Sequence, residues 1–216
     1  MKLERMDPLP RDPARVQLQF ADGTQLRTTV TLAADFGLYA GRDLDESELA
    51  ALQLAVRKAG ARQRAVRIVS AAAVSEAELE KRLIQKGEDP EDAAEAVRWL
   101  QDLGAVNDRE LAGRVARQAA AKGYGPARIR QALYQKGIPR ALWDEAMADL
   151  PEPDDAIDRF LQQRLGGTWP DRKTLQKTTD ALVRRGHSRE DIRSALARYR
   201  ESLEASEPAD FPDEAF

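Results

Sequence analysis

The chain has 216 residues, a formal net charge of −3 and no cysteine, which excludes a disulfide framework and thiolate metal sites. No apolar run approaches the length of a transmembrane helix, so we expect a cytoplasmic protein without a membrane segment. Abundant Ala, Leu, Arg and Glu with few aromatic residues predict a mainly helical fold.

The N-terminal part of the sequence carries the signals for β structure. Residues 1–13 are rich in proline and charge, and we expect a flexible lead-in there. In residues 14–70, two alternating segments flank Asp22-Gly23, a pair typical of a two-residue hairpin turn, and the second segment continues through Leu32. A helix is predicted from about Asp45, because Glu48 completes a capping-box pattern. This region therefore predicts a β-hairpin covered by helices.

A glycine-centred pattern recurs along the rest of the chain, at Gly87, Gly137 and Gly186. A leucine stands four residues before each glycine, and small or apolar residues stand nine, ten and thirteen residues after it, Tyr199 included. These offsets share one stripe of a helix. Each glycine is predicted to end one helix, and the residues that follow it are typical of the start of the next helix.

The recurring pattern predicts tandem three-helix repeats. We expect one repeat at residues 71–122, a second at 123–168 and a partial third at 169–204, followed by an acidic tail at 205–216. Units this small cannot bury their apolar stripes alone, so we expect them to stack into an elongated, curved helical array. The predicted fold class is mainly α, with a small N-terminal β-hairpin.

No residue pattern indicates catalysis. His187 is the single histidine, and we interpret it as a polar loop residue because a metal site needs several ligands. Gly166-Gly167-Thr168 lacks the lysine of a phosphate-binding loop, and no nucleophile motif is present. The carboxylates near Glu88 crowd the first turn of a predicted helix, where the helix dipole stabilises them. We expect no catalytic residue, no metal and no cofactor.

Basic residues are concentrated between positions 109 and 136, where Glu110 is the only acidic residue. The seven basic residues are Arg109, Arg114, Arg117, Lys122, Arg128, Arg130 and Lys136. A solvated helix face and a surface for an anionic partner are both consistent with this pattern. No base-reading or RNA-stacking signature accompanies it, so sequence-specific recognition is not indicated.

Trp99 is a further candidate for partner binding. It lies one residue off the apolar stripe of its predicted helix. We interpret it either as core filler or as an amphipathic anchor at a protein interface.

Several segments resemble the RecX family, whose members regulate the RecA recombinase. The matching segments are SEAELEKRLIQKG at residues 75–87, VND at 106–108 and GPARIRQALYQKGI at 125–138. With LYAGRDL at 38–44, the resemblance extends over about residues 38–199. The family has paired aspartates where this chain has Asn107 and Asp108.

The resemblance implies tandem three-helix repeats that bind along the groove of the RecA–DNA filament. It also implies inhibition of filament growth, recombination, ATP hydrolysis and coprotease activity, and so a role in DNA repair and the SOS response. The chain is then a non-enzymatic modulator, expected to be monomeric, whose seven basic residues and Trp99 contact the filament, with weak non-specific DNA contact. An alternative is a stand-alone DNA-binding protein in which helix pairs act as helix-turn-helix units.

Overall fold

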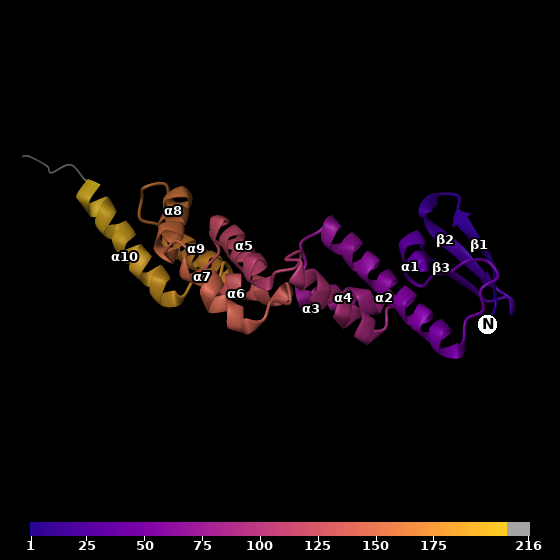
Figure 1. Ribbon diagram of the computed structural model, residues 1–216. Helices are drawn as coiled ribbons and strands as arrows, with labels where there is room; N and C mark the ends of the chain where they lie inside the picture. Colours follow the sequence, from indigo (N-terminus) through magenta and orange to yellow (C-terminus); the bar gives the residue numbers. More distant parts are fainter. Residues whose placement is uncertain (207–216) are drawn as a thin grey trace, which may run out of the picture. The chain divides into compact units, whose positions relative to one another are not determined.

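The computed structural model describes residues 1–206 and is mainly helical, with one small sheet near the N-terminus (Figure 1). This confirms the predicted fold class. The acidic tail expected at 205–216 lies, apart from its first two residues, outside the described residues. The chain divides into two units: Met1–Ala73 with Leu79–Val106, and Val74–Glu78 with the residues from Asn107 onward.

The sheet of the first unit has three antiparallel strands in the order β1 (Leu3–Leu9), β2 (Asp12–Phe20) and β3 (Gln25–Thr29). Residues expected to form a flexible lead-in therefore form an edge strand. Leu3 is fully buried in the core of this unit, which holds the strand in place. The charges and Pro8 that suggested flexibility are tolerated because an edge strand leaves one side free of ladder hydrogen bonds.

Strands β2 and β3 form the predicted hairpin, but through a different turn. The Phe20 amide donates to the Thr24 carbonyl and the Gly23 amide donates to the Phe20 carbonyl, both at 2.9 Å. Gly23 has a φ of +85°, whereas Asp22 has no positive φ. The turn is therefore a three-residue loop with glycine in the left-handed position, because a two-residue type I′ turn needs positive φ at both residues.

Strand β3, the second strand of the hairpin, ends earlier than its alternating pattern predicts. Helix α1 (Val30–Asp35) replaces the last part of the pattern. The hydroxyl of Thr29 accepts a hydrogen bond from the Leu32 amide at 3.1 Å, so threonine acts as an N-cap at a position where alternation alone predicts a strand residue.

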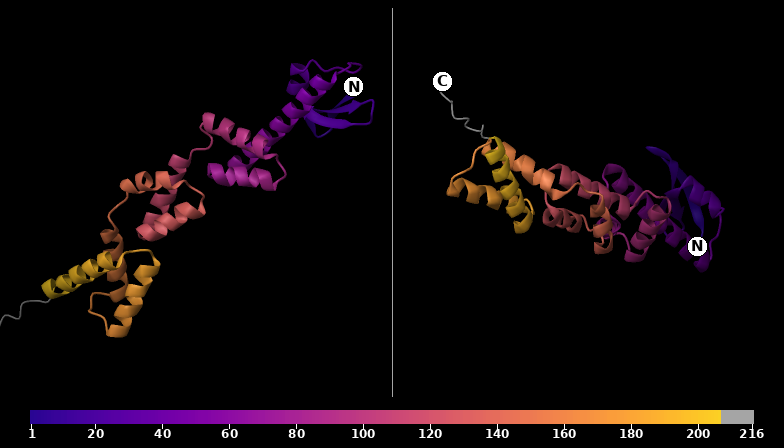
Figure 2. Two further views of the ribbon diagram at one scale, coloured as in Figure 1. Left: turned by 90° about the horizontal axis from the view of Figure 1, so that it is seen from below. Right: turned by 90° about the vertical axis from the view of Figure 1, so that its left-hand side faces the viewer.

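The long helix α2 (Glu46–Ala71) begins where its capping box predicts. The Asp45 carboxylate accepts from the Glu48 amide at 2.8 Å, and the Glu48 carboxylate accepts from the Asp45 amide at 3.0 Å. The first half of α2 lies beside the sheet (Figures 1 and 2), where fully buried Leu52 joins the cluster formed by the strands. The sheet therefore packs against a helix, which a small sheet needs for stability in water.

The second half of α2 packs against α4 (Pro90–Asp102), which follows α3 (Glu76–Gln85) in the chain. Ala61 and Ala65 on α2 and Ala96 on α4 are fully buried. Small side chains of this kind allow two helices to approach closely. Ion pairs between the two helices, such as Arg57 with Asp92 at 3.2 Å, add to this contact.

The second unit contains two groups of three helices, each with its own buried cluster. One group contains α5 (Asp108–Ala121), α6 (Pro126–Gln135) and α7 (Trp143–Ala148), with the short helix η1 (Arg140–Leu142) before α7. The other contains α8 (Pro153–Leu165), α9 (Arg172–Arg184) and α10 (Arg189–Ser206). Side chains of all three helices meet in each cluster, and those that α7 contributes are partly buried.

This grouping differs from the predicted ranges of 71–122, 123–168 and 169–204. Helix α5 falls in the first predicted repeat, yet Leu111 and Ala116 on α5 pack with Ile129 and Leu133 on α6. The predicted partial repeat is a complete group, because α8 supplies its first helix. The glycine pattern locates the last two helices of each group, but it does not indicate to which side the remaining helix packs.

Two of the repeat glycines, Gly137 and Gly186, are contact points inside the second unit. Gly186 follows α9, and next to it the Gly125 amide, at the start of α6, donates to the Arg185 carbonyl at 2.9 Å. The Ala127 amide donates to the Gly186 carbonyl at 3.2 Å. His187 also contributes, because its Nε2 lies 3.1 Å from the Gly123 carbonyl oxygen. The glycine after α9 thus binds the start of α6 mainly through main-chain atoms.

The glycine after α6 has the same role toward the start of α3. Ser75, the residue before α3, donates its hydroxyl to the Lys136 carbonyl at 2.6 Å, and a Cβ atom on Gly137 would lie 3.1 Å from this hydroxyl. The Asp108 carboxylate accepts from the Glu76 amide at 3.0 Å. All of these residues belong to the second unit, so Val74–Glu78 are held by it.

Candidate partner-binding surface

Helix α5 positions the first three predicted basic residues. It begins at an N-cap in which the Asn107 side chain accepts from the Glu110 amide at 3.1 Å. One side of the helix is lined with small buried residues, and Arg109, Arg114 and Arg117 remain exposed on the other side. At about 100° per residue, the three arginines fall within an arc of about 140°. The structure therefore brings these three residues to one side of α5.

Two of the three arginines have carboxylate partners. Arg109 pairs with Glu145 on α7 at 3.1 Å, and Arg114 pairs with Glu110 one turn earlier at 3.0 Å. All four side chains are largely exposed, and such pairs contribute only about 0–1 kcal/mol. An anionic partner can therefore replace either carboxylate at small cost.

The other basic residues have no ion pair with any residue that the structure describes. These residues are Arg117, Lys122, Arg128, Arg130 and Lys136, and all five are exposed. Lys122 and Lys136 occupy the C-terminal caps of α5 and α6, where the helix dipole favours a cation. The group therefore presents five cations whose charge is not neutralised by a neighbouring carboxylate.

The basic residues of α6 do not extend the α5 surface as one continuous face. Arg128 and Arg130 are two residues apart and therefore lie about 160° apart around the helix. Arg128 donates to the Gln131 side chain at 2.8 Å and its guanidinium lies 5.7 Å from the centre of the Tyr124 ring. Arg130 lies four residues before Tyr134, which is 68% exposed. The spacing of Arg130 and Tyr134 is visible in the sequence, but the predicted site does not include the tyrosine.

Trp99 lies in the first unit, whereas all seven basic residues lie in the second. Its ring is half-buried, and the guanidinium of Arg62 on α2 is 5.4 Å from the ring centre. Arg62 and Lys58 both bind Glu95 on α4. Burial alone would raise the pKa of Glu95, but these two cations lower it below its ordinary value. The Arg62 guanidinium therefore lies over the Trp99 ring in the folded chain.

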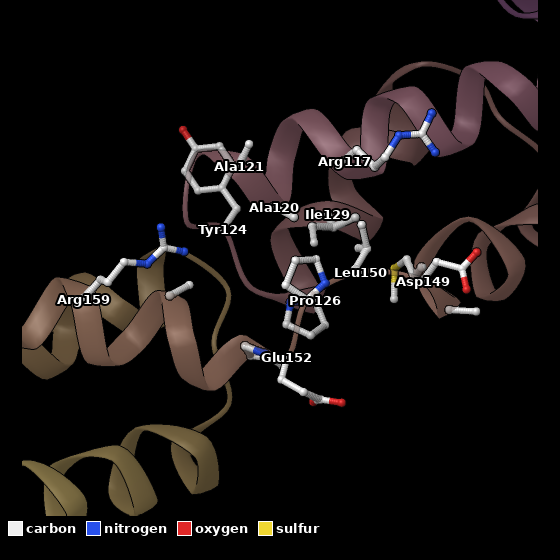
Figure 3. Close-up of a pocket in the computed structure, with 15 residues that line it drawn as sticks. Arg117, Ala120, Ala121, Tyr124, Pro126, Ile129, Asp149, Leu150, Glu152 and Arg159 are labelled. Atoms are coloured by element: carbon white, nitrogen blue, oxygen red, sulfur yellow. The ribbon is translucent and has the colours of Figure 1, made fainter.

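The second unit also contains a groove of about 550 Å³, shown in Figure 3. Its lining comes from the end of α5, the start of α6, the end of α7 and the first turns of α8. Arg117 and Arg159 lie at opposite sides of the groove, with Ile129 and Leu150 between them (Figure 3). Periodicity within one repeat could not reveal this groove, because helices from two different groups form it.

Within residues 1–206, no cluster of His, Asp or Glu side chains is suited to holding a metal ion. His187 is buried, and this burial lowers its pKa. Its Nε2 faces the Gly123 carbonyl and its Nδ1 is buried without a partner, so it is a neutral residue that donates to a main-chain oxygen. None of the helices that the structure describes is both long and apolar enough to span a bilayer.

Comparison with known proteins identifies the family. A family model described as the first three-helix domain of RecX matches residues 61–100, and one described as the second three-helix domain matches residues 107–147. A protein of Cronobacter sakazakii named regulatory protein RecX is 33% identical over 146 residues, which cover 61% of this chain and 87% of that protein. The chain belongs to the RecX family.

A second relative supports this assignment, and two solved structures share the fold. A regulatory protein RecX of Xanthomonas axonopodis pv. citri is 33% identical over 136 residues, covering 62% of this chain and 83% of that protein. A crystal structure titled regulatory protein RecX has a TM-score of 0.70 at 24% identity and covers 91% of this chain and 98% of its own. RecX from Lactobacillus salivarius has a TM-score of 0.59 at 20% identity, covering 68% and 99%. These two structures share the fold.

The matched family domains follow the observed grouping of the helices. The second domain, at residues 107–147, contains α5, α6 and nearly all of α7, which share one buried cluster. The first domain, at residues 61–100, contains the end of α2, α3 and most of α4. All seven predicted basic residues fall within the second domain: five lie on α5 and α6, and Lys122 and Lys136 are the C-terminal caps of these two helices.

Proposed function

We propose that this chain is a non-enzymatic regulator of the RecA recombinase. It binds the RecA–DNA filament as a cytoplasmic monomer and limits ATP hydrolysis, recombination and coprotease activity. Membership in the RecX family and relatives named regulatory protein RecX support this proposal. The proposal needs a surface that attracts an anionic polymer, since the filament carries DNA phosphates.

The observation that carries the proposal is the set of five exposed cations on the α5–α7 group that have no carboxylate partner among residues 1–206. A cation without an intramolecular carboxylate is available to a partner without breaking an existing contact. Neutralising phosphates with such cations releases bound counterions, so the affinity falls steeply as salt rises. We therefore expect filament binding through α5 and α6 to weaken strongly with increasing ionic strength.

A charge reversal on α5 tests the proposal. In the Arg114→Glu, Arg117→Glu double variant, two attractive charges become repulsive while the buried side of α5 is unchanged. We expect the concentration that half-inhibits RecA-catalysed ATP hydrolysis on single-stranded DNA to rise by about tenfold or more, equivalent to about 1.4 kcal/mol of binding free energy. The far-ultraviolet circular dichroism should remain that of the native chain.

The matched control reverses two other exposed arginines in the second unit, Arg189→Glu and Arg193→Glu on α10. This variant has the same net charge as the α5 variant but leaves the α5–α7 group intact. We expect it to change half-inhibition by less than about threefold. Unchanged inhibition by the α5 variant, or equal loss in both variants, contradicts the proposed surface.

A second titration distinguishes the proposed RecA regulator from the alternative, a stand-alone DNA-binding protein. Labelled single-stranded and double-stranded DNA are titrated with the chain, with and without RecA, at several salt concentrations. A RecA regulator binds bare DNA weakly and the RecA-coated strand tightly. Tight binding to bare DNA that RecA does not improve would favour the helix-turn-helix alternative instead.

A further inference from the structure

Basic side chains from both three-helix groups of the second unit meet at the junction between the end of α9 and the start of α6. The Arg185 guanidinium, at the C-terminal cap of α9, donates to the carbonyl oxygen of Lys122, the cap of α5, at 3.1 Å. A Cβ atom on Gly186 would lie 2.7 Å from the Cβ atom of Arg128 on α6. The main chains of Arg128 and of Arg185, the residue before Gly186, are therefore close together. We call Lys122, Arg128 and Arg185 the junction cations.

Both junction arginines are held in place by aromatic rings and neutral acceptors. The Arg185 guanidinium lies 4.8 Å from the centre of the Phe160 ring, and the Arg128 guanidinium lies 5.7 Å from the centre of the Tyr124 ring. Arg128 also donates to the Gln131 side chain at 2.8 Å. Contacts of this kind orient a cation without neutralising its charge. The two arginines are therefore positioned in advance for an anion, which lowers the entropic cost of binding it.

The charges of the junction are predominantly positive. The segments that meet there are residues 122–128 and 184–191, and their only acidic residues are Glu190 and Asp191. Their cations are Lys122, Arg128, Arg184, Arg185 and Arg189. None of these five cations has an ion pair in the part of the chain that the structure describes. With the buried His187 neutral, five cations and two carboxylates leave a net charge of +3 at the junction.

Single-stranded nucleic acid is the partner whose chemistry fits the junction. Its backbone carries one phosphate per nucleotide, and arginine binds phosphate oxygens through parallel hydrogen bonds. Its unpaired bases also stack on guanidinium planes, and the exposed Arg128 side chain offers such a plane. A carboxylate-rich peptide supplies the negative charge but no planar base. The combination of fixed guanidinium groups and excess positive charge therefore favours a nucleic-acid strand.

We infer that the junction binds a single-stranded nucleic acid, with phosphates at the junction cations and a base against Arg128. Lys122 and Arg128 belong to one three-helix group and Arg185 to the other, so a bound strand contacts both groups at once. Arg185 is not among the seven basic residues that the sequence singles out. The site therefore extends the candidate partner-binding surface beyond the α5–α7 group. Its binding does not rest on the proposed function and is measured without RecA.

A titration with a labelled strand tests the inference. A fluorescent oligothymidylate of about twelve nucleotides is titrated with the full chain at several salt concentrations, without RecA. We expect saturable binding with a dissociation constant of about 1–100 µM at physiological salt, falling steeply as the salt is lowered. This affinity is in the range of binding that does not depend on base sequence.

Variants that remove charge locate the strand. Each of Lys122→Gln, Arg128→Gln and Arg185→Gln should reduce the slope of log affinity against log salt by about 0.7, which corresponds to one phosphate of a single strand. The triple variant should reduce the slope by about 2 and weaken binding by about tenfold or more at low salt. Lys122→Gln retains the carbonyl that accepts from Arg185, so it removes the charge without disturbing the junction. Arg185→Lys retains the charge and should retain the slope.

The matched control removes three cations from the first unit, in the Arg67→Gln, Lys81→Gln, Lys86→Gln variant. These side chains are exposed and have no ion pair in the described part of the chain. The control has the same net charge as the triple junction variant. We expect it to bind the strand with the slope of the native chain, because the strand does not contact these residues.

Two further probes test the chemical class of the partner. An abasic strand keeps the phosphates and lacks the bases, and the native chain should bind it several-fold more weakly than oligothymidylate. Arg128→Gln should bind the two strands alike. Polyglutamate with the same number of charges should displace the labelled strand only at a concentration about tenfold higher than unlabelled oligothymidylate, because it has no base to stack on Arg128.

Three outcomes would overturn the inference. They are native binding and native slope in the triple junction variant, equal losses in the junction variant and its control, and polyglutamate that competes as well as oligothymidylate. The last outcome would assign the junction to an acidic protein partner. None of these readouts involves RecA, so a failure here leaves the proposed function intact. A failure of the charge reversals at Arg114 and Arg117 likewise leaves the junction site intact.

Discussion

A Cβ atom on Gly125 would lie 2.5 Å from the carbonyl oxygen of Gly186, a distance that real Cβ contacts do not show. The start of α6 and the residue after α9 therefore meet through their main chains. Glycine is required at both positions, in one case for space and in the other for space and for a φ of +90°.

Replacing Gly186 tests this junction. In Gly186→Ala the new Cβ would lie 2.4 Å from the Arg128 amide nitrogen. We expect a loss of about 2–4 kcal/mol in the free energy of unfolding, from left-handed strain and overpacking together.

Gly87→Ala is the control, because Gly87 has nearly the same φ of +89° and nothing within 4 Å of the new Cβ. It should cost only the strain of about 1–2 kcal/mol. Urea unfolding of both variants, followed by circular dichroism, measures the difference, and equal losses would contradict a close main-chain contact.

His187 predicts a loss of stability in mild acid. Burial lowers its pKa in the folded chain below the 6.5 of an exposed histidine, although the Gly123 carbonyl partly opposes this. As the pH falls below 6.5, the unfolded chain binds the proton first, so the free energy of unfolding falls with pH. Between pH 7.5 and 5.5 this contributes at most about 1.4 kcal/mol.

The His187→Gln variant is the matched comparison, because glutamine retains a donor toward Gly123 and does not titrate in this range. We expect its stability to vary less between pH 7.5 and 5.5 than that of the native chain. Asp108, whose pKa is raised by burial, remains in both proteins and has the opposite effect, so it does not account for the difference. Identical pH dependence in the two proteins would show that His187 does not contribute.

The Arg57–Asp92 pair is expected to matter for the first unit. Asp92 is only 3% exposed and its carboxylate lies 3.2 Å from the Arg57 side chain, which is 60% exposed. Arg57→Met leaves a buried carboxylate without its cation, and we expect a loss of about 1–3 kcal/mol in the free energy of unfolding.

The control is Arg5→Met, which breaks the exposed pair with Asp7 and should lower the free energy of unfolding by less than about 0.5 kcal/mol. Adding Asp92→Asn to Arg57→Met should restore part of the loss, and no restoration would mean that Arg57 acts through packing alone.

One variant shows whether Trp99 stabilises the fold or contacts a partner. Its packing under Arg62 predicts that Trp99→Ala lowers the free energy of unfolding by about 1–3 kcal/mol. We expect the half-inhibition of RecA to remain unchanged when measured at a temperature where the variant is fully folded. An increase under that condition would place Trp99 on the partner-binding surface.

Sequence patterns predict the features of this chain that depend on local interactions. The start of α2 follows from Asp45 and Glu48, and the helix ends at Gly87, Gly137 and Gly186 follow from glycine adopting positive φ. These features need only residues within one or two turns of each other, and the structure confirms them.

Features that depend on distant residues were not predictable in the same way. Strand β1 exists because Leu3 enters a core formed by later residues, and α5 belongs with α6 because their buried faces fit. For the candidate surface, the sequence identifies the cations but not their partners: Arg109 pairs with Glu145, thirty-six positions later. The groove beside Arg117 requires α8, which no local pattern connects to α5.

The junction at Gly125 and Gly186 also bears on how such a chain can diverge. Most of its hydrogen bonds join peptide groups, which every residue type except proline supplies in full. Substitutions on the outer faces of each helix group therefore leave the geometry of this joint unaltered, provided that the glycines remain. Surface charge in each group can thus change independently during evolution while the spacing between the two groups is preserved.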